Sequence, residues 1–443
     1  MIQTIRNAWK VQELRNKILF TLFALLIFRL GSAIPVPFIN TTLLQSQMDI
    51  QSSIFGLLNV MSGDAFAQAT VFALSIQPYI NSSIIIQLLT IAIPALERLS
   101  KDGGEEGKKK INAITRYTTV GIAVIQAFGY YTMLKYYGVL ETSGVWPAFV
   151  IIAAFTAGSA FVMWLGEQIT EFGIGNGISI ILFAGIVSRG PNMVVKMIQG
   201  VGNWANKVTG ENVTTLHPVF IPLILIGMIL LVFFVVFISN AERRIPVQYA
   251  KRVVGRKMYG GQSTHLPIKV NMSGVMPVIF AQAIASIPAT IGMFVPAAQT
   301  KGTGWYTFLE VFDSTSLLYC IIYGLLIVMF SYFYNTIQFN PVEVSNNLKK
   351  NGGFIPGFRP GKPTGDFLAK VISRITLFGA LFLAVVALLP AITGGIMNAC
   401  GSTAGSGLAI GGTSVIIVVG VALETVKALE AQLMMRHYKG FLE

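Results

Sequence analysis

The side chains that could do acid–base, nucleophilic or metal chemistry lie outside the long apolar runs of this sequence. Among 443 residues there are only 19 Asp and Glu, and none falls inside an uncharged run long enough to cross a membrane. His217, His265 and His437 lie in loops or at run edges, and the two cysteines show no metal-ligand spacing. Hydrolysis within a membrane needs a nucleophile with a base, or a metal with its ligands. We therefore expect no enzyme activity, no metal site and no cofactor.

The polar groups inside the apolar runs are neutral amides. An ion-coupled transporter usually places an ionisable group near the membrane midplane, so this class is poorly supported. A neutral lining suits a wet path that passes many solutes without binding them. The alternative is that each amide hydrogen-bonds a neighbouring helix. The residues concerned are Asn81, Gln87, Gln126 and Gln282.

The apolar runs define the architecture that must position these groups. Hydrophobic residues make up 53% of the chain and charged residues 12%, whereas soluble domains average roughly 25% charged residues. About 20 helical residues cross the hydrocarbon core. We therefore predict an all-α polytopic membrane protein with ten transmembrane helices. The expected spans lie within 18–34, 65–96, 117–134, 142–166, 172–188, 219–239, 270–300 and 314–342, with two more within 375–423.

The distribution of Lys and Arg predicts the orientation, because cytoplasmic segments of membrane proteins are rich in both. Of the 32 such residues, 26 lie in alternate connections and in the two terminal segments, so both termini are expected in the cytoplasm. The loops 240–270 and 340–374 are the largest of these connections. Their charge reflects either this bias alone or a docking platform for a large anionic partner.

The stretch SIQPYINSSIIIQLL at residues 75–89 puts a proline and several amides into an expected span. Residues 35–69 before it carry no Lys or Arg, and Gly56 and Gly63 break their apolar character. A half-helix that folds back into the protein fits this segment, because non-helical backbone at membrane depth must be buried in protein or line a cavity. We expect Pro78 to begin or kink the crossing helix.

Five ordered stretches resemble the SecY family, the central subunit of the bacterial protein-translocation channel. They read PYINSSIIIQLL, MWLGEQITEFGIGNGISIIL, QSTHLPIKVNMSGVMPVIFA, NNLKKNGGFIPGFRPG and GGTSVIIVV. The resemblance extends over about residues 11–438. It implies two pseudo-symmetric five-helix halves, 1–200 and 201–443, around a central pore that opens sideways to lipid. Within this resemblance, GIGNG is expected to form a tight turn that leads into the fifth helix.

The resemblance also implies roles for particular residues. A ring of aliphatic side chains would constrict the pore: Ile76, Ile80, Leu182, Ile279, Ile284 and Ile417. A plug, at about 53–69, would include Ser53, Phe55, Gly56, Leu57, Met61, Gly63 and Phe66. Spans two and three would face spans seven and eight across a lateral gate, with Asn81, Gln87, Gln126 and Gln282 as its polar contacts. Docking of the ribosome or an ATPase would use Arg243, Arg244, Lys251, Arg252, Arg256, Lys257, Lys349, Lys350, Arg359 and Lys362.

The function that the resemblance implies is a passive protein-conducting channel. It would move unfolded secretory polypeptides across the bacterial cytoplasmic (inner) membrane and release transmembrane segments laterally into the bilayer. The implied partners are the small membrane subunits SecE and SecG, the motor ATPase SecA, the translating ribosome, signal sequences, nascent polypeptides and membrane lipids. The alternatives are an inverted-repeat secondary transporter of small solutes and a membrane scaffold that transports nothing.

Overall fold

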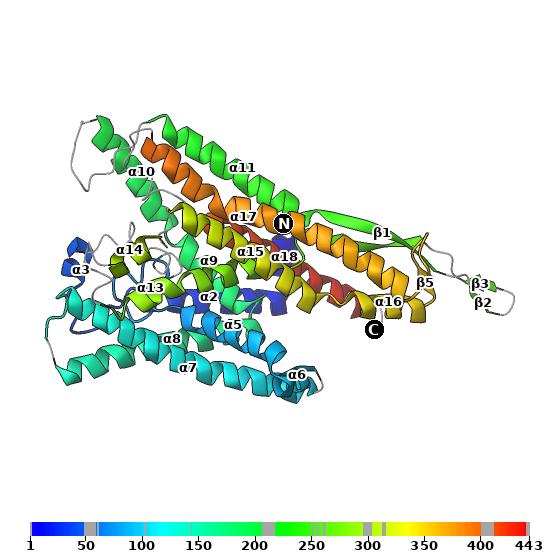
Figure 1. Cartoon of the computed structure of the whole chain (residues 1–443), viewed down its shortest axis with the longest axis horizontal. Coiled ribbons are helices and arrows are strands. Elements are labelled where there is room, and N and C mark those ends of the chain that lie inside the picture. The colour runs from blue at the N-terminus through cyan, green and yellow to red at the C-terminus, as the bar shows by residue number, and fades with distance from the viewer. Residues whose placement is uncertain are drawn as a thin grey trace.

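A computed structural model describes most of the chain, and its elements are helices apart from five strands (Figure 1). The described residues are 2–47, 59, 62–101, 103–142, 144–205, 218–249, 252–254, 257–259, 263–295, 304–311, 316–399 and 412–439.

The first part of the chain is helical. Its elements are α1 (Ile2–Lys10), α2 (Gln12–Gly31), α3 (Thr41–Gln47), α5 (Gln77–Ala92), α6 (Pro94–Lys101), α7 (Gly104–Tyr136), α8 (Val145–Phe172), α9 (Gly177–Val187) and α10 (Gly190–Ala205). Two predicted breaks are confirmed. Ile76 caps α5 and Pro78 lies in its first turn, where the missing N–H of proline costs nothing. In GIGNG, Gly175 has a φ of +69°, and the Asn176 side chain accepts hydrogen bonds from the N–H groups of Ile178 and Ser179 at the start of α9.

The second part mixes helices with strands. Its elements are α11 (Phe220–Asn240), β1 (Glu242–Tyr249), β2 (Arg252–Val254), β3 (Lys257–Tyr259), β4 (Ser263–Lys269), α12 (Met276–Ala285), α13 (Ile287–Gly292), α14 (Gly304–Val311), α15 (Leu317–Gln338), α16 (Pro341–Lys350), β5 (Gly353–Phe354), α17 (Lys362–Ala399) and α18 (Gly412–Lys439).

The strands correct the all-α expectation, because residues 242–249 and 263–269 of the predicted loop pair as antiparallel strands. β1 pairs with β4 from Glu242↔Lys269 to Gln248↔Ser263, and also with β5 through Gln248↔Phe354. Ile245 and Val247 alternate with exposed residues along β1 and pack with Ile268 of β4 and with α17. Alternation with a period of two suits a strand with one buried face. The hairpin extends from the helical body, with β2 and β3 at its far end (Figure 1).

Four described helices are long and apolar enough to cross a membrane, and they indicate a membrane protein. They are Val145–Phe172, Ile221–Asn240, Leu318–Lys350 and Lys362–Leu389. A fifth is added if Gln77–Ala92 and Pro94–Ser100, bent by 105°, count as one span. Several predicted spans are shorter helices here: α9 has 11 residues, and α12 and α13 divide at Ser286. The count of ten therefore stays a prediction.

The helices pack into one body in which segments far apart in sequence meet. α7 packs against both α5 and α8, while α15 packs against both α12 and α17. These two groups touch where α5 meets α12 and where α7 meets α13. α18 contacts α1, α9, α11 and α17, and so joins the two ends of the chain. The pseudo-symmetry of the halves 1–200 and 201–443 stays a prediction.

Candidate pore and gate

The six residues of the predicted ring all belong to one large apolar cluster, together with many other core residues. Five of them are buried, with exposed fractions from 1% to 4%, and the sixth is partly buried and packs against the cluster. The six residues come from four helices, and the first and last of them are more than 300 residues apart in the sequence. They are Ile76 at the cap of α5, Ile80 in α5, Leu182 in α9, Ile279 and Ile284 in α12, and Ile417 in α18.

Part of the predicted plug lies outside the described residues, namely Ser53, Phe55, Gly56, Leu57 and Met61. The described end of this segment, residues 62–69, is named the plug base here. A Cβ on Gly63 would lie 2.8 Å from the Gly185 carbonyl oxygen, so the plug base touches α9 through backbone. Phe66 is 1% exposed and stacks on Tyr130 of α7, whose hydroxyl donates to the Phe66 carbonyl at 2.6 Å. The plug base is therefore held against two helices.

An ion pair that sequence reasoning missed also holds the plug base. Arg189 follows α9, and its Nε lies 3.1 Å from Oδ1 of Asp64, with side-chain exposed fractions of 25% and 17%. The same Oδ1 accepts a hydrogen bond from the Asn59 amide at 2.9 Å. The sequence gives little indication of this ion pair. Both residues lie in segments that the charge distribution assigns to the non-cytoplasmic side, but nothing in the sequence pairs them.

The four predicted gate residues are only partly brought together. Gln126 in α7 and Gln282 in α12 are buried, at 6% and 2% exposed, and neither side-chain oxygen has a hydrogen-bond partner among the described residues. Asn81 and Gln87 in α5 are partly buried, and the Gln87 amide lies 3.5 Å from the Ser83 hydroxyl of its own helix. Within the described chain the four form no hydrogen bond with one another.

A different pair bridges the proposed gate. The Gln77 amide, in the first turn of α5, donates to the Ser286 hydroxyl between α12 and α13 at 3.2 Å. Nearby, the Thr132 hydroxyl of α7 donates to the Met293 carbonyl at 2.9 Å. Both bonds join the group that contains α5 and α7 to the group that contains α12 and α13. In the sequence, the one feature that marks Gln77 is its position directly before Pro78.

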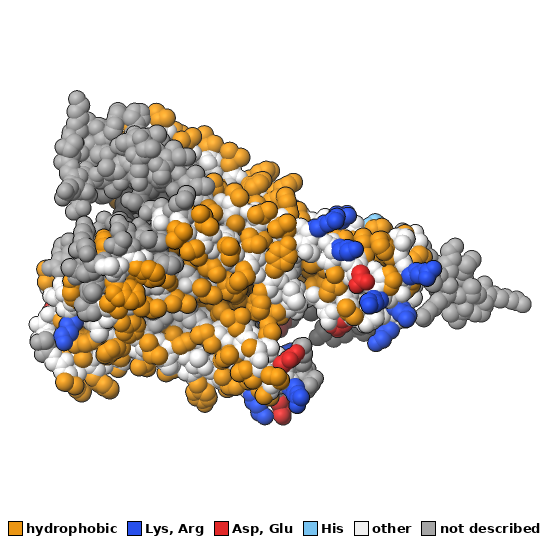
Figure 2. Space-filling view, viewed as in Figure 1, with side chains coloured by type: hydrophobic (Ala, Val, Ile, Leu, Met, Phe, Trp, Pro, Cys, Tyr) orange, Lys and Arg blue, Asp and Glu red, His pale blue; other side chains and the backbone are white. Residues whose placement is uncertain are grey.

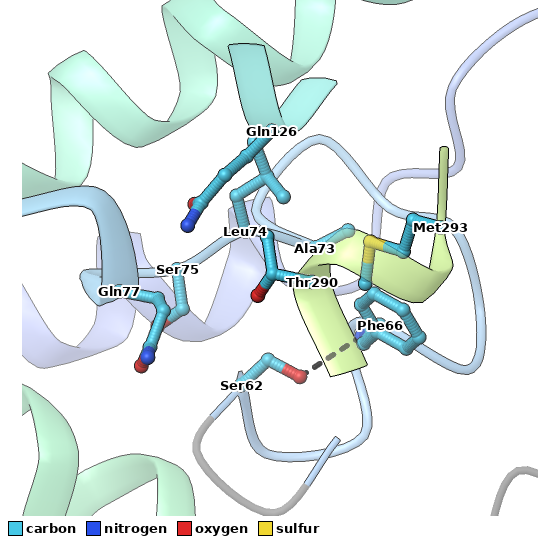
Figure 3. A pocket seen from close by; sticks show the side chains of 9 residues that line it. All are labelled: Ser62, Phe66, Ala73, Leu74, Ser75, Gln77, Gln126, Thr290 and Met293. Atoms are coloured by element: carbon cyan, nitrogen blue, oxygen red, sulfur yellow. Dashed lines mark hydrogen bonds between the residues drawn. The ribbon is translucent and has the colours of Figure 1, made fainter. Parts of the chain in front are cut away.

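Figure 3 shows a small cavity between the plug base and this junction. Its volume of about 20 Å³ is room for one water molecule. Three buried oxygens on its lining have no partner among the described residues, on Ser75, Gln77 and Gln126. At the plug base the Phe66 N–H donates to the Ser62 hydroxyl at 3.0 Å (Figure 3). The cavity is lined by Ser62, Phe66, Ala73, Leu74, Ser75, Gln77, Gln126, Thr290 and Met293.

The two basic loops meet in the β4–β1–β5 sheet. Lys and Arg gather at this end of the molecule, whereas hydrophobic side chains cover the helical body (Figure 2). The GFRPG turn is well fixed: the Ser345 hydroxyl donates to the Gly361 carbonyl, and the Phe358 and Phe367 rings stack 4.1 Å apart. The exposed docking candidates are Arg243, Arg244, Lys349, Lys350, Arg359 and Lys362. Lys251 and Arg256 lie outside the described residues, and Arg252 and Lys257 lie in β2 and β3.

Two other charged groups are perturbed by their surroundings. Arg116 of α7, just before the expected third span, donates from Nε to Oε1 of Glu167 of α8 at 2.8 Å, and this bond raises the pKa of the guanidinium. Burial and the positive charge of Lys269 lower the pKa of Lys427 in α18. The described residues contain no group of three or more His, Cys, Asp or Glu that could hold a metal ion.

Known proteins resemble this chain along its whole length. The SecY family matches residues 70–426. Relatives named protein translocase subunit SecY are 44% identical in Bacillus subtilis and 43% identical in Streptomyces coelicolor, each over 100% of both chains.

Solved structures show the same fold at lower identity. A protein-conducting channel superposes with a TM-score of 0.63 at 19% identity, over 94% of this chain and 92% of its own. Sec61 from the canine ribosome–channel complex of the endoplasmic reticulum gives 0.60 at 18% identity, with the same coverage. With the family match and the relatives spanning its full length, this chain belongs to the SecY family.

Proposed function

We propose that this chain is a passive protein-conducting channel for unfolded polypeptides. The observation that carries the proposal is that six large aliphatic side chains, contributed by four helices, all belong to one central apolar cluster. In the open state these side chains would form a gasket around the moving chain, because aliphatic groups offer it no hydrogen bonds. A narrow apolar ring also excludes water and ions by dewetting. Force would come from translation or an ATPase.

The plug-like segment, at about 53–69, would close the pore at rest. Its base is held by Tyr130 and by the Asp64–Arg189 ion pair, contacts that are few enough to break reversibly. The lateral gate would part between α5 and α7 on one side and α12 and α13 on the other. Opening would break the Gln77–Ser286 bond, and Asn81, Gln87, Gln126 and Gln282 would line or border the path that a transmembrane segment takes into lipid.

The shared sheet supports a docking role for both basic loops. A translating ribosome presents RNA phosphates, and exposed Lys and Arg side chains bind such surfaces in a salt-dependent way. The motor ATPase SecA would use the same surface, while SecE and SecG would bind the lipid-facing helices. In this arrangement the sheet and both termini lie in the cytoplasm of a bacterium, and the chain spans its inner membrane ten times in two five-helix halves.

Reconstitution tests the proposed function. Vesicles that contain the chain with its small subunits and the motor ATPase should protect a secretory precursor from external protease in an ATP-dependent way. Vesicles without the chain should not protect it. Ion-driven uptake of a small solute with no precursor protection would contradict the channel and support the transporter alternative.

Arg359→Glu tests the docking role. Because Arg359 is exposed on a fixed turn, its reversal should weaken co-sedimentation with translating ribosomes or with the ATPase about tenfold at low salt and less at high salt. Arg374→Glu, on the exposed face of α17, is the matched control and should change binding little. No loss in Arg359→Glu would mean that the basic residues serve only to set the topology, and equal losses in both variants would mean that binding depends on net charge and not on this turn.

A further inference from the structure

A polar cavity lies directly beside the proposed pore ring. Its volume is about 190 Å³, and its walls come from α9, the segment before α12, α12 itself, α15 and α18. Ile279 of the ring forms part of the wall. Apart from Glu424, every lining residue is uncharged. The lining residues are Ser179, Met272, Ser273, Gly274, Val275, Met276, Ile279, Tyr334, Gln338 and Glu424.

Glu424 is exposed as a residue, its side chain lines the cavity, and its carboxylate has no hydrogen bond or ion pair with the described residues. It lies against the backbone at Gly274, where a Cβ would come 2.6 Å from Oε1 and where φ is +62°. Lys427 is one turn further along α18, but its ammonium group donates to the Asn240 side chain of α11 at 3.0 Å. Lys427 and Lys269 therefore act on Glu424 only through their longer-range charge. The carboxylate remains available to a ligand that enters the cavity.

The groups around the cavity suit an organic cation. One carboxylate with neighbouring hydroxyl and amide oxygens accepts hydrogen bonds from an ammonium or guanidinium group. A calcium ion would need six to eight oxygen ligands, including several carboxylates or carbonyls, and the described lining offers a single carboxylate. A flexible cationic side chain carried by a polypeptide needs only this one charged partner.

We propose that Glu424 binds a Lys or Arg side chain in the positively charged segment that precedes the apolar part of a signal sequence. This inference rests on the proposed function, since it requires polypeptides to enter beside the ring. Secretory signals carry such a basic segment directly before 7–15 apolar residues. A cation held at Glu424 would place the following apolar residues next to Ile279 and α12, which borders the proposed gate.

Translocation of two matched precursors tests the site, one with a Lys-rich and one with a neutral N-terminal segment. Glu424→Gln should slow the Lys-rich precursor about three- to tenfold and leave the neutral one nearly unchanged. Glu424→Asp, which keeps the charge, should recover most of the rate. Glu430→Gln is the control. Like Glu424, Glu430 is a negative charge that acts on Lys427, but Glu430 does not line the cavity. Equal slowing of both precursors, or no change in either, would overturn the proposal.

A crosslink separates this inference from the proposed function. A carbodiimide joins a carboxylate to a contacting lysine without a spacer, so a signal peptide with a single basic-segment lysine should become attached to Glu424 of the reconstituted protein. The Glu430→Gln protein should give the same product, and Glu424→Gln should lose it. If the precursors are not translocated but the crosslink forms, the channel function fails and the site stands. If translocation proceeds and the crosslink is equally strong in Glu424→Gln, the site fails and the channel stands.

Discussion

The Asp64–Arg189 ion pair holds the plug base through two side chains that are three-quarters or more buried. Asp64 has a φ of +70°, a conformation that Asn also tolerates, so Asp64→Asn removes the charge without backbone strain. The Asn59 hydrogen bond to that position can persist. Each of Asp64→Asn and Arg189→Gln should therefore raise the open fraction about fivefold, corresponding to about 1 kcal/mol. Single-channel recording in planar bilayers measures this fraction, and the double variant should resemble either single one. Additive effects would show that the two residues do not act as a pair.

The Gln77–Ser286 hydrogen bond should favour the closed gate. Ser286→Ala leaves the buried Gln77 amide without its partner, which costs about 1–3 kcal/mol in the closed state only. We expect this variant to translocate a precursor whose signal sequence has a shortened apolar segment, which the native protein rejects. Ser331→Ala is the matched control, because among the described residues that hydroxyl bonds the Ile327 carbonyl of its own helix and no other helix. A Ser286→Ala protein that still rejects the weakened signal would contradict a latch at this position.

At the scale of elements, α8 packs so closely on the chain before α5 that one position tolerates no side chain. A Cβ on Gly158 would lie 2.0 Å from the Val71 carbonyl oxygen, so Gly158→Ala must push that segment away. We expect the thermal midpoint in detergent to fall by several degrees. Gly121→Ala in α7 meets open space and should be neutral or slightly stabilising, because Ala favours helix. Equal midpoints for the two variants would mean that this helix contact contributes little to stability.

The sequence predicts elements best where one physical signal dominates. The run 219–239 matches α11 (Phe220–Asn240) within a residue, because length and hydropathy alone define it. The run 117–134 falls short of α7 (Gly104–Tyr136), because that helix continues beyond the apolar part into charged residues. The hairpin of β1 and β4 was missed, since its many cations hide the alternation of Ile245 and Val247.

The candidate site was predictable to a smaller extent. Buried isoleucines are common in any core, so the sequence pattern alone does not separate Ile76 or Ile279 from packing residues, and only the family resemblance picked them out. The Asp64–Arg189 and Gln77–Ser286 contacts join positions 125 and 209 residues apart. Such pairs depend on how helices pack, which no local pattern encodes.

At the scale of the whole molecule, an apolar helical body and a basic end form separate surfaces (Figure 2). Most apolar side chains of α11 lie on the outside, with Ile226 58% exposed, whereas Ile279 is 4% exposed within the buried apolar cluster that contains the ring residues. The central claim is that a moving polypeptide passes through this cluster and not along the lipid-facing surface. Ile279 and Ile226 are therefore a matched pair. Ile279 is expected to contact the moving polypeptide, and Ile226 is expected to contact lipid.

Crosslinking to a stalled polypeptide tests this claim most directly. Ile279→Cys and Ile226→Cys are made separately in a chain whose two native cysteines are replaced by serine, and a precursor with one cysteine is arrested halfway across the membrane. The account predicts a disulfide between the precursor and position 279 and none at position 226. Equal crosslinking at both positions, or crosslinking at 226 alone, would contradict a pore through the apolar cluster.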